Sequence, residues 1–202
     1  MRERILGTVK RSWLYTLVAV LLLAAGVGAY SLGRIIGNNE ANTSLSGTAL
    51  QTPVNLSNVQ LQTSEGDFEF ADLNGKVVVV FFGFVGCPDV CPLTMSRLAE
   101  IYRNIGEPED LAVVMVTVDP ENDTPELVKN YATGFHPKFV GLGGDNSQVA
   151  EAAKRFFIGY SATDGGVVHT DPVLILDRNS AMQRVYSQTN LSQLQNDLPR
   201  LL

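Results

Sequence analysis

The sequence predicts an α/β domain with a central mixed sheet flanked by helices. Residues 77–84 and 111–118 are apolar runs without polar alternation, typical of strands buried on both faces. Apolar residues at helical spacing lie between these runs, as expected for parallel strands joined by a helix. Two later runs, 173–176 and 182–186, flank a short turn and predict an antiparallel hairpin in the same sheet.

The other elements are predicted from local patterns along the chain. Apolar and polar residues alternate within 59–70 on either side of a Gly-containing turn, which predicts an extra N-terminal hairpin. Thr124 precedes Pro125 and Glu126, a typical start for a helix ending near Phe135. Further predicted elements are helices at 92–106, 148–157 and 191–202 and a short strand at 139–142. This order of elements is that of a thioredoxin-like domain.

The N-terminal segment predicts an N-terminal transmembrane helix. Residues 12–33 contain no charge, and four basic side chains precede them within residues 1–11. The length suits a bilayer-spanning helix, and the basic segment places the N-terminus in the cytoplasm and the following domain on the outer, periplasmic or equivalent, face. A cleaved signal peptide is the alternative, although its apolar core is usually shorter. Both interpretations export the domain.

The remainder of the chain divides into two parts. Residues 34–55 are polar, rich in small side chains and without period, so we expect a linker there and a folded domain over residues 56–202. The first eleven residues hold four of the 15 basic and one of the 21 acidic side chains, which leaves the exported part with a net charge near −9. An acidic domain repels phosphate backbones, so nucleic-acid binding is excluded as a function class.

The two cysteines of the chain lie just beyond the first buried strand. Cys87 and Cys91 are four residues apart, and Pro92 suits the start of the helix that follows. Thiols at a helix N-terminus are expected to favour the thiolate, which is the form that attacks disulfides and binds metals. A buried inert pair is one alternative. A structural disulfide is another, but it would close a very short loop and remove little chain entropy.

Two histidines are candidate partners of these cysteines. His169 precedes the strand at 173–176, in a loop that stands beside the cysteine turn in a thioredoxin-like arrangement. Two thiolates and one imidazole suit Cu(I), which favours soft ligands. Zinc is the alternative metal, although structural zinc normally has four protein ligands. A solvated loop histidine is the structural alternative for His169, and a cation at a helix C-terminus explains His136.

Three further side chains lie within reach of the same rim. Asp119 and Asp123 follow the second buried strand, but turn and cap chemistry accounts for both. Met95 is four residues beyond Cys91 on the same helical face, where a thioether can contact a metal or simply fill the core.

Several stretches match one known family. They are residues 82–84, the CPDVCP sequence of 87–92, the VDPENDTPE sequence of 118–126, residues 135–137 and His169. The match covers roughly residues 59–186, and on these residues the chain closely resembles the Sco family of copper chaperones. Val168 and Pro172 depart from the family pattern, which often has Asp before the histidine. Pro172 is also placed like the cis-proline of thioredoxins, which would favour thiol exchange with a partner.

The resemblance implies a function, ligands and partners. It implies a membrane-anchored thioredoxin-like domain that binds copper through Cys87, Cys91 and His169, with Cu(I) as the expected form and Cu(II) as the open alternative. It further implies delivery to the dinuclear copper centre of cytochrome c oxidase, with the copper-site subunit of the oxidase as partner and other copper chaperones as further candidates.

A second function belongs to a different class. A thiol–disulfide oxidoreductase would use Cys87 and Cys91 as its catalytic pair to reduce the cysteines of a partner protein. The three-residue spacing between the cysteines disfavours this, since dedicated exchange enzymes commonly have two. A peroxiredoxin-type peroxidase lacks the expected Pro and Thr before its cysteine, and a purely structural membrane-tethered domain remains as the least specific interpretation.

Overall fold

The structure of the protein, a computed structural model, describes Tyr15 and residues 20–23, 45–163 and 166–202. The chain divides into two units, residues 1–44 and 45–202, and the second is the folded domain. Nearly all of the predicted basic segment and anchor, residues 1–33, lies outside the described residues. Among the residues that are described, no helix combines the length and the apolar character that a bilayer crossing requires.

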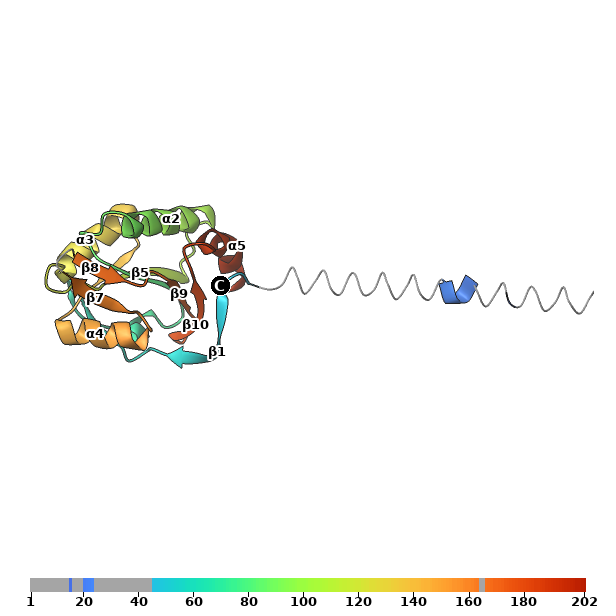
Figure 1. Ribbon diagram of the computed structural model, residues 1–202, viewed down its shortest axis with the longest axis horizontal. Helices are drawn as coiled ribbons and strands as arrows, with labels where there is room; N and C mark the ends of the chain where they lie inside the picture. The colour runs from blue at the N-terminus through green and yellow to red at the C-terminus, as the bar shows by residue number, and fades with distance from the viewer. Residues whose placement is uncertain (1–14, 16–19, 24–44, 164–165) are drawn as a thin grey trace, which may run out of the picture. The chain divides into compact units, whose positions relative to one another are not determined.

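A six-stranded sheet in the order β1-β10-β9-β4-β5-β6 forms the centre of the domain (Figure 1). The strands β4, β5 and β6 are parallel. On the other side of β4 each pair is antiparallel: β9 with β4, β10 with β9, and β1 with β10. The predicted mixed sheet is therefore confirmed. The six strands are β1 (Thr48–Asn55), β4 (Val77–Gly83), β5 (Leu111–Thr117), β6 (Val140–Leu142), β9 (Val173–Leu176) and β10 (Ala181–Tyr186).

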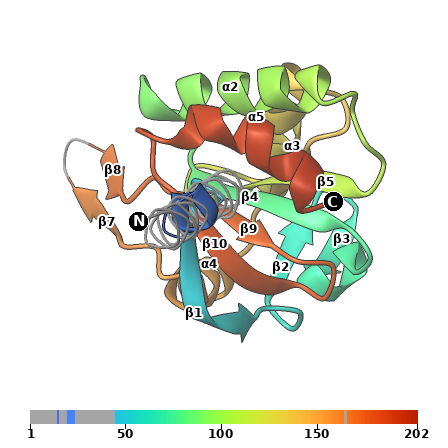
Figure 2. The same ribbon diagram turned by 90° about the vertical axis from the view of Figure 1, so that its right-hand side faces the viewer.

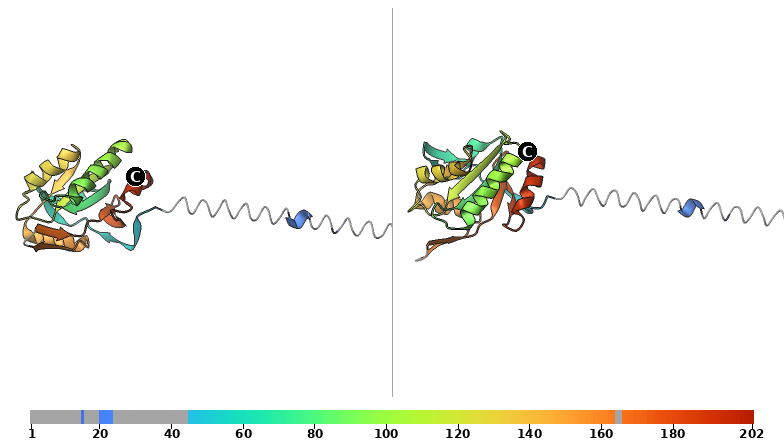
Figure 3. Two further views of the ribbon diagram at one scale, coloured as in Figure 1. Left: turned by 45° about the horizontal axis from the view of Figure 1, so that its top comes forward. Right: turned by 90° about the horizontal axis from the view of Figure 1, so that it is seen from above.

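Helices cover both faces of this sheet. Figures 2 and 3 show α2, α3 and α5 on one face and α4 on the other. Two separate hairpins, β2–β3 and β7–β8, complete the domain. The bounds are α2 (Val90–Asn104), α3 (Pro125–Phe135), α4 (Asn146–Arg155), α5 (Leu194–Asp197), the 3-10 turns η1 (Phe70–Leu73), η2 (Leu191–Gln193) and η3 (Leu198–Arg200), and the hairpin strands β2 (Gln60–Thr63), β3 (Gly66–Glu69), β7 (Tyr160–Thr163) and β8 (Gly166–His169).

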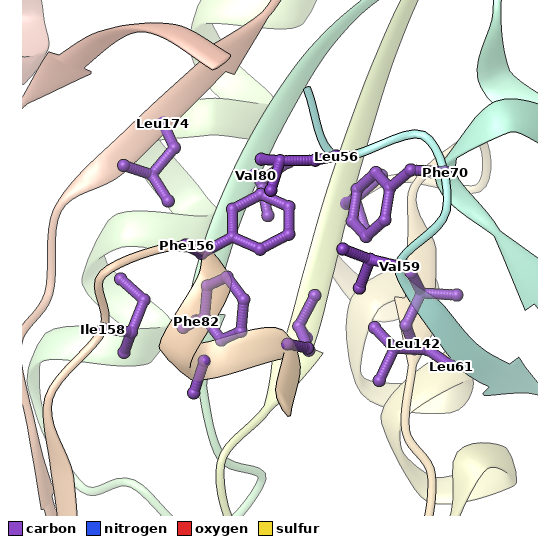
Figure 4. Packing of buried hydrophobic residues seen from close by; sticks show 14 of the residues in the cluster. Leu56, Val59, Leu61, Phe70, Val80, Phe82, Leu142, Phe156, Ile158 and Leu174 are labelled. Carbon is purple, nitrogen blue, oxygen red and sulfur yellow. The ribbon is translucent and has the colours of Figure 1, made fainter. Parts of the chain in front are cut away.

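Alternate side chains of strand β4 belong to two core clusters, one on each face of the sheet. Val78, Val80 and Phe82 point to one face, where Phe156 and Phe70 pack over them (Figure 4). The alternate residues, Val79 and Phe81 among them, point to the opposite face with Cys91, Met95 and the buried side of α2. Successive side chains of a strand face opposite sides, so a fully apolar run serves two cores at once. This double burial fixes the end of β4, from which the cysteine loop departs.

The predicted linker requires a correction. Residues 48–55, which the sequence places in the linker, form strand β1 and pair with β10. Polar contacts anchor the start of this segment, because the Ser46 amide donates to Asp197 Oδ2 at 2.7 Å and Arg184 Nη1 donates to the Gly47 carbonyl at 2.9 Å. Most side chains of β1 are exposed, so the strand has no apolar alternation to recognise. The presence of Pro53 is consistent with an edge position.

Two other segments differ from the prediction. His169, expected in a loop, instead ends strand β8, which pairs with β7 as a hairpin. The last predicted helix, 191–202, is divided into η2, α5 and η3. Pro199 accounts for the last break, since it has no backbone N–H to donate to the preceding turn.

Gly141 in β6 is expected to tolerate no side chain. A Cβ at this position would lie 2.4 Å from the backbone C and O atoms of Val128 in α3, so the helix would have to move away from the sheet. We expect Gly141→Ala to lower the free energy of unfolding by about 3 kcal/mol, measured by urea titration. Gly134→Ala is the matched control, because a Cβ there meets nothing within 4 Å and alanine favours the helix. Equal stability of the two variants would contradict this packing.

Candidate metal centre

The cysteine loop follows β4 directly. The chain turns through residues 84–87, and the Cys87 amide donates to the Phe84 carbonyl at 3.2 Å. Helix α2 then begins at Val90, and the Cys91 amide donates to Cys87 Sγ at 3.4 Å. Cys91 is buried and Cys87 is partly exposed, and both are free thiols. The two sulfurs therefore lie at the N-terminus of α2, as predicted.

His169 reaches the sulfurs from the end of β8. Its ring lies edge-on to Phe81 and Phe84, with ring centroids 6.4 and 5.9 Å away. Its Nδ1 lies 2.9 Å from the Thr170 carbonyl, and its Nε2 lies 3.7 Å from Cys91 Sγ. A carbonyl only accepts hydrogen bonds, so this contact assigns the proton to Nδ1. The lone pair of Nε2 is then directed toward the sulfurs, as a metal ligand requires.

Two residues that sequence reasoning missed hold the segment after His169. Gln188 Nε2 donates to the Asp171 carbonyl at 2.8 Å, and the Thr94 hydroxyl donates to Gln188 Oε1 at 3.2 Å. Thr94 belongs to α2, so these bonds connect the histidine segment to the helix that carries Cys91. Asp171 and Gln188 are 17 residues apart, and no local sequence signal marks the contact.

Cys87, Cys91 and His169 together form a candidate metal site. The ligand atoms of the three residues all lie within 4.8 Å of one another. Around one ion with bonds of about 2.2 Å, ligand atoms in a trigonal arrangement would be about 3.8 Å apart. Movements of about 1 Å would thus bring the three onto one ion. The set contains two soft sulfurs and one imidazole and no carboxylate, which favours a soft ion such as Cu(I) over Mg²⁺ or Ca²⁺.

The pKa of the Cys91 thiol is shifted in the direction opposite to that expected for a thiol at a helix N-terminus. Burial raises the pKa of the Cys91 thiol, and the hydrogen bond with Cys87 raises it further. The predicted preference for thiolate at the helix N-terminus is therefore outweighed by desolvation in the metal-free site. A positive ion bound between the sulfurs would reverse this balance by displacing the proton.

The other candidate residues take structural positions. Asp119 accepts hydrogen bonds from the side chain of Asn122, and Asp123 is buried and accepts from the Thr117 hydroxyl and the Val85 amide, so neither carboxylate belongs to the Cys-Cys-His group. Met95 is fully buried in the core cluster beneath Cys91. His136 is buried between Tyr102 and Phe139, and its Nδ1 accepts a hydrogen bond from the Lys138 amide at 3.3 Å. His136 is therefore a core residue at the end of α3, and it is not part of the Cys-Cys-His group.

An apolar hollow adjoins the three candidate ligands. It has a volume of about 300 Å³, and its lining residues are Phe84, Cys87, Pro88, Asp89, Val90, Val167, Val168 and His169. Val168, which stands where the Sco family often has Asp, is 65% exposed. The candidate metal site thus lies at the surface under a largely apolar rim.

Gly83 is expected to control the position of Cys91. A Cβ on Gly83 would lie 2.9 Å from Cys91 Sγ and 2.9 Å from the Phe81 ring, so the sulfur or the ring would have to move. We expect Gly83→Ala to weaken metal binding about tenfold or more, the scale seen when groups that orient ligands are lost. Gly86→Ala is the control in the same loop, because its Cβ meets nothing closer than 3.9 Å. Equal affinities in a chelator competition would contradict this role.

The fold and the site define a class of protein: a thioredoxin-like domain with a Cys-Cys-His cluster at its surface. The sequence profile of the SCO1/SenC family matches residues 51–201. The SCO2-like protein of Rickettsia felis is 32% identical over 175 residues, which cover 81% of this chain and 80% of that protein. The chain therefore belongs to the SCO1/SenC family.

Solved structures agree with this assignment. The apo Sco1 protein of Thermus thermophilus superposes with a TM-score of 0.71 at 34% identity, covering 79% of this chain and 98% of that one. The copper-bound ScoI of Bradyrhizobium japonicum gives a TM-score of 0.64 at 29% identity, covering 75% and 98%. The predicted thioredoxin-like α/β fold is thereby confirmed.

Proposed function

We propose that this chain is a copper chaperone that holds one copper ion between Cys87, Cys91 and His169. The convergence of two sulfurs and one imidazole nitrogen within 4.8 Å is the observation on which the proposal rests. The copper-bound state of the related ScoI supports the choice of metal. Two thiolates favour Cu(I) as the carried form. Zinc is disfavoured, because the only other histidine in the sequence is buried elsewhere in the core.

The burial of the three ligands suits release to a partner. Cys87 and His169 are partly exposed, whereas Cys91 is fully buried. Ligands of an incoming protein would therefore replace Cys87 and His169 first, and Cys91 would be the last to release the ion. We propose the dinuclear copper centre of cytochrome c oxidase as the destination, on the basis of the family, with the copper-site subunit as the partner. Other copper chaperones are candidate donors of the metal.

The N-terminal segment would keep this exchange close to the membrane. Residues 12–33 are uncharged and follow a basic segment, which supports an anchor with the N-terminus in the cytoplasm and the domain on the outer face. A membrane-embedded oxidase would then meet the chaperone on a surface rather than in bulk solution.

Direct transfer tests the proposed function. The reduced chain, loaded with one equivalent of Cu(I), is mixed with the metal-free copper domain of an oxidase subunit, and the two are separated and assayed for copper. The proposal predicts that copper moves to the oxidase domain. Copper that stays on the chain, or a chain that prefers zinc when both metals compete, would contradict it.

Thiol exchange is the second candidate function, because both cysteines are free. The partly exposed Cys87 would attack a partner disulfide and the buried Cys91 would resolve the mixed disulfide. Pro172, which is placed like the cis-proline of thioredoxins, follows a trans peptide bond. Reduction of the oxidase cysteines before copper loading remains compatible with the chaperone function.

The raised pKa of Cys91 makes copper affinity depend on pH. In the metal-free site burial keeps Cys91 a neutral thiol, so copper must displace its proton. The apparent Cu(I) affinity should therefore rise with pH between 6 and 8, about tenfold per pH unit for each proton released. Competition with a chelator of known pH dependence measures this slope. A flat profile would show that Cys91 stays protonated in the complex and is not a thiolate ligand.

A further inference from the structure

Asp123 is a buried carboxylate without a compensating cation. Its side chain is 4% exposed and lies between β5 and α3. No Lys, Arg or His forms an ion pair with it among the residues that the structure describes. Burial of a carboxylate is costly unless hydrogen bonds satisfy its oxygens, so the contacts of Asp123 indicate what it stabilises.

The carboxylate of Asp123 accepts two hydrogen bonds, and both end on one oxygen, Oδ2. The Thr117 hydroxyl donates to it at 2.6 Å from the end of β5, and the Val85 amide donates to it at 2.9 Å from the cysteine loop. Val85 lies two residues before Cys87, inside the turn that the bond from the Cys87 amide to the Phe84 carbonyl closes. Asp123 thereby connects two loops that are 38 residues apart in the sequence.

The loop that carries Asp123 is itself held in place. The Asp123 amide donates to the Asp119 carbonyl at 2.9 Å, and the Thr117 hydroxyl accepts from the Asp119 amide at 3.0 Å. A continuous path of hydrogen bonds therefore runs from the end of β5 through Asp123 to Val85. The turn then leads to Cys87, whose Sγ accepts from the Cys91 amide at 3.4 Å.

We propose that Asp123 is a positioning residue of the copper site, which holds the cysteine turn so that Cys87 faces Cys91 and His169. This assignment rests on the proposed copper function. Without the carboxylate the Val85 amide loses its partner and the turn is free to adopt other conformations. Copper binding must then order the turn again, and the affinity falls by the 10- to 100-fold that loss of a ligand-orienting group typically causes.

Asp197 provides a matched control in the same domain. It is also a buried carboxylate, 3% exposed, and its Oδ2 also accepts from one backbone amide, that of Ser46, and one hydroxyl, that of Tyr186. These contacts hold β1 and β10 and not the cysteine loop. Asp197→Ala should therefore lower stability without changing the copper affinity of the folded chain.

The test compares four variants of the full chain by Cu(I) competition and by thermal unfolding. We expect Asp123→Ala to bind copper 10- to 100-fold more weakly. Asp123→Asn should stay within about threefold of the wild-type affinity, because the amide oxygen accepts both bonds. Asp197→Ala should match the wild-type affinity. Thr117→Val removes the bond that the hydroxyl donates to Asp123 and the one it accepts from the Asp119 amide, at nearly constant volume. It should weaken copper binding about fivefold or more, which keeps the test decisive if Asp123→Ala does not fold. Unchanged affinity in Asp123→Ala and Thr117→Val, or an equal loss in Asp197→Ala, would overturn the proposal.

If the proposed copper function is wrong, the wild-type chain itself will not bind copper, and this result is distinct from those above. The assignment of Asp123 is then decided by the rate at which oxidised glutathione converts the two thiols to the Cys87–Cys91 disulfide with release of two glutathione thiols. A rate altered in Asp123→Ala but not in Asp197→Ala supports the positioning role, and equal rates in all three proteins overturn it.

Discussion

Cys91→Ala is expected to abolish measurable Cu(I) binding. Cys91 supplies one of two thiolate ligands, and its sulfur lies 3.7 Å from His169 Nε2, so its loss leaves one sulfur and one nitrogen. Loss of a direct ligand should exceed the 10- to 100-fold cost of losing a group that only orients ligands. Removing a small buried side chain leaves a modest cavity, and the domain should remain folded. Competition with a Cu(I) chelator, together with circular dichroism, measures both properties.

Met95→Leu is the control for Cys91→Ala. Met95 is the other sulfur-containing residue of helix α2 and is fully buried in the same core cluster as Cys91. Leucine conserves the volume, so we expect a loss of less than about 1.5 kcal/mol in stability and no change in copper affinity. A fall in affinity with Met95→Leu would make the thioether a ligand, and full copper binding by Cys91→Ala would remove the paired-thiolate site.

His169→Ala is expected to weaken Cu(I) binding by about 100-fold or more, because the third ligand is lost while the sulfurs stay in place. The ring lies at the end of β8 and packs edge-on against Phe84 at the surface, so little core contact disappears. Cys87 and Cys91 should still form a disulfide on oxidation, and dithiothreitol should still reduce it, since neither cysteine depends on the His169 ring for a backbone contact. Copper affinity and disulfide reduction by dithiothreitol, measured on the same sample, separate the two functions.

His136→Gln is the matched control for His169→Ala, since the sequence contains only these two histidines. His136 is buried and packs between Tyr102 and Phe139, so its loss should lower stability and leave copper affinity unchanged. If His169→Ala binds copper like the wild type, His169 is not a ligand and only a redox thiol pair remains. If His136→Gln loses affinity instead, the wrong histidine has been assigned.

The strands at the centre of the fold could be predicted because they bury both faces. The uninterrupted apolar runs of β4 and β5 have few alternatives to a central position. By contrast, β1 is an edge strand with mostly exposed side chains, and backbone pairing with β10 rather than an apolar face holds it in the domain. The β7–β8 hairpin is likewise defined by pairing, which leaves little trace in local composition.

The candidate site was likewise predictable only in part, because contacts between distant segments leave little trace in the local sequence. Cys87 and Cys91 are neighbours in sequence, so their spacing places both at one helix terminus. His169 is 78 residues from Cys91, and only the fold and the family resemblance bring them together. The bonds from Gln188 to the Asp171 carbonyl and from the Val85 amide to Asp123 have no sequence signature, because each depends on how distant loops pack.

The central claim is that two sulfurs and one imidazole nitrogen hold a single copper ion. X-ray absorption at the copper edge of the reduced chain, loaded with one equivalent of Cu(I), measures this coordination directly. The account predicts one copper per chain with a shell of two sulfurs and one nitrogen, the nitrogen disappearing in His169→Ala. A shell of sulfurs alone in the wild type, or one that His169→Ala leaves unchanged, would contradict it.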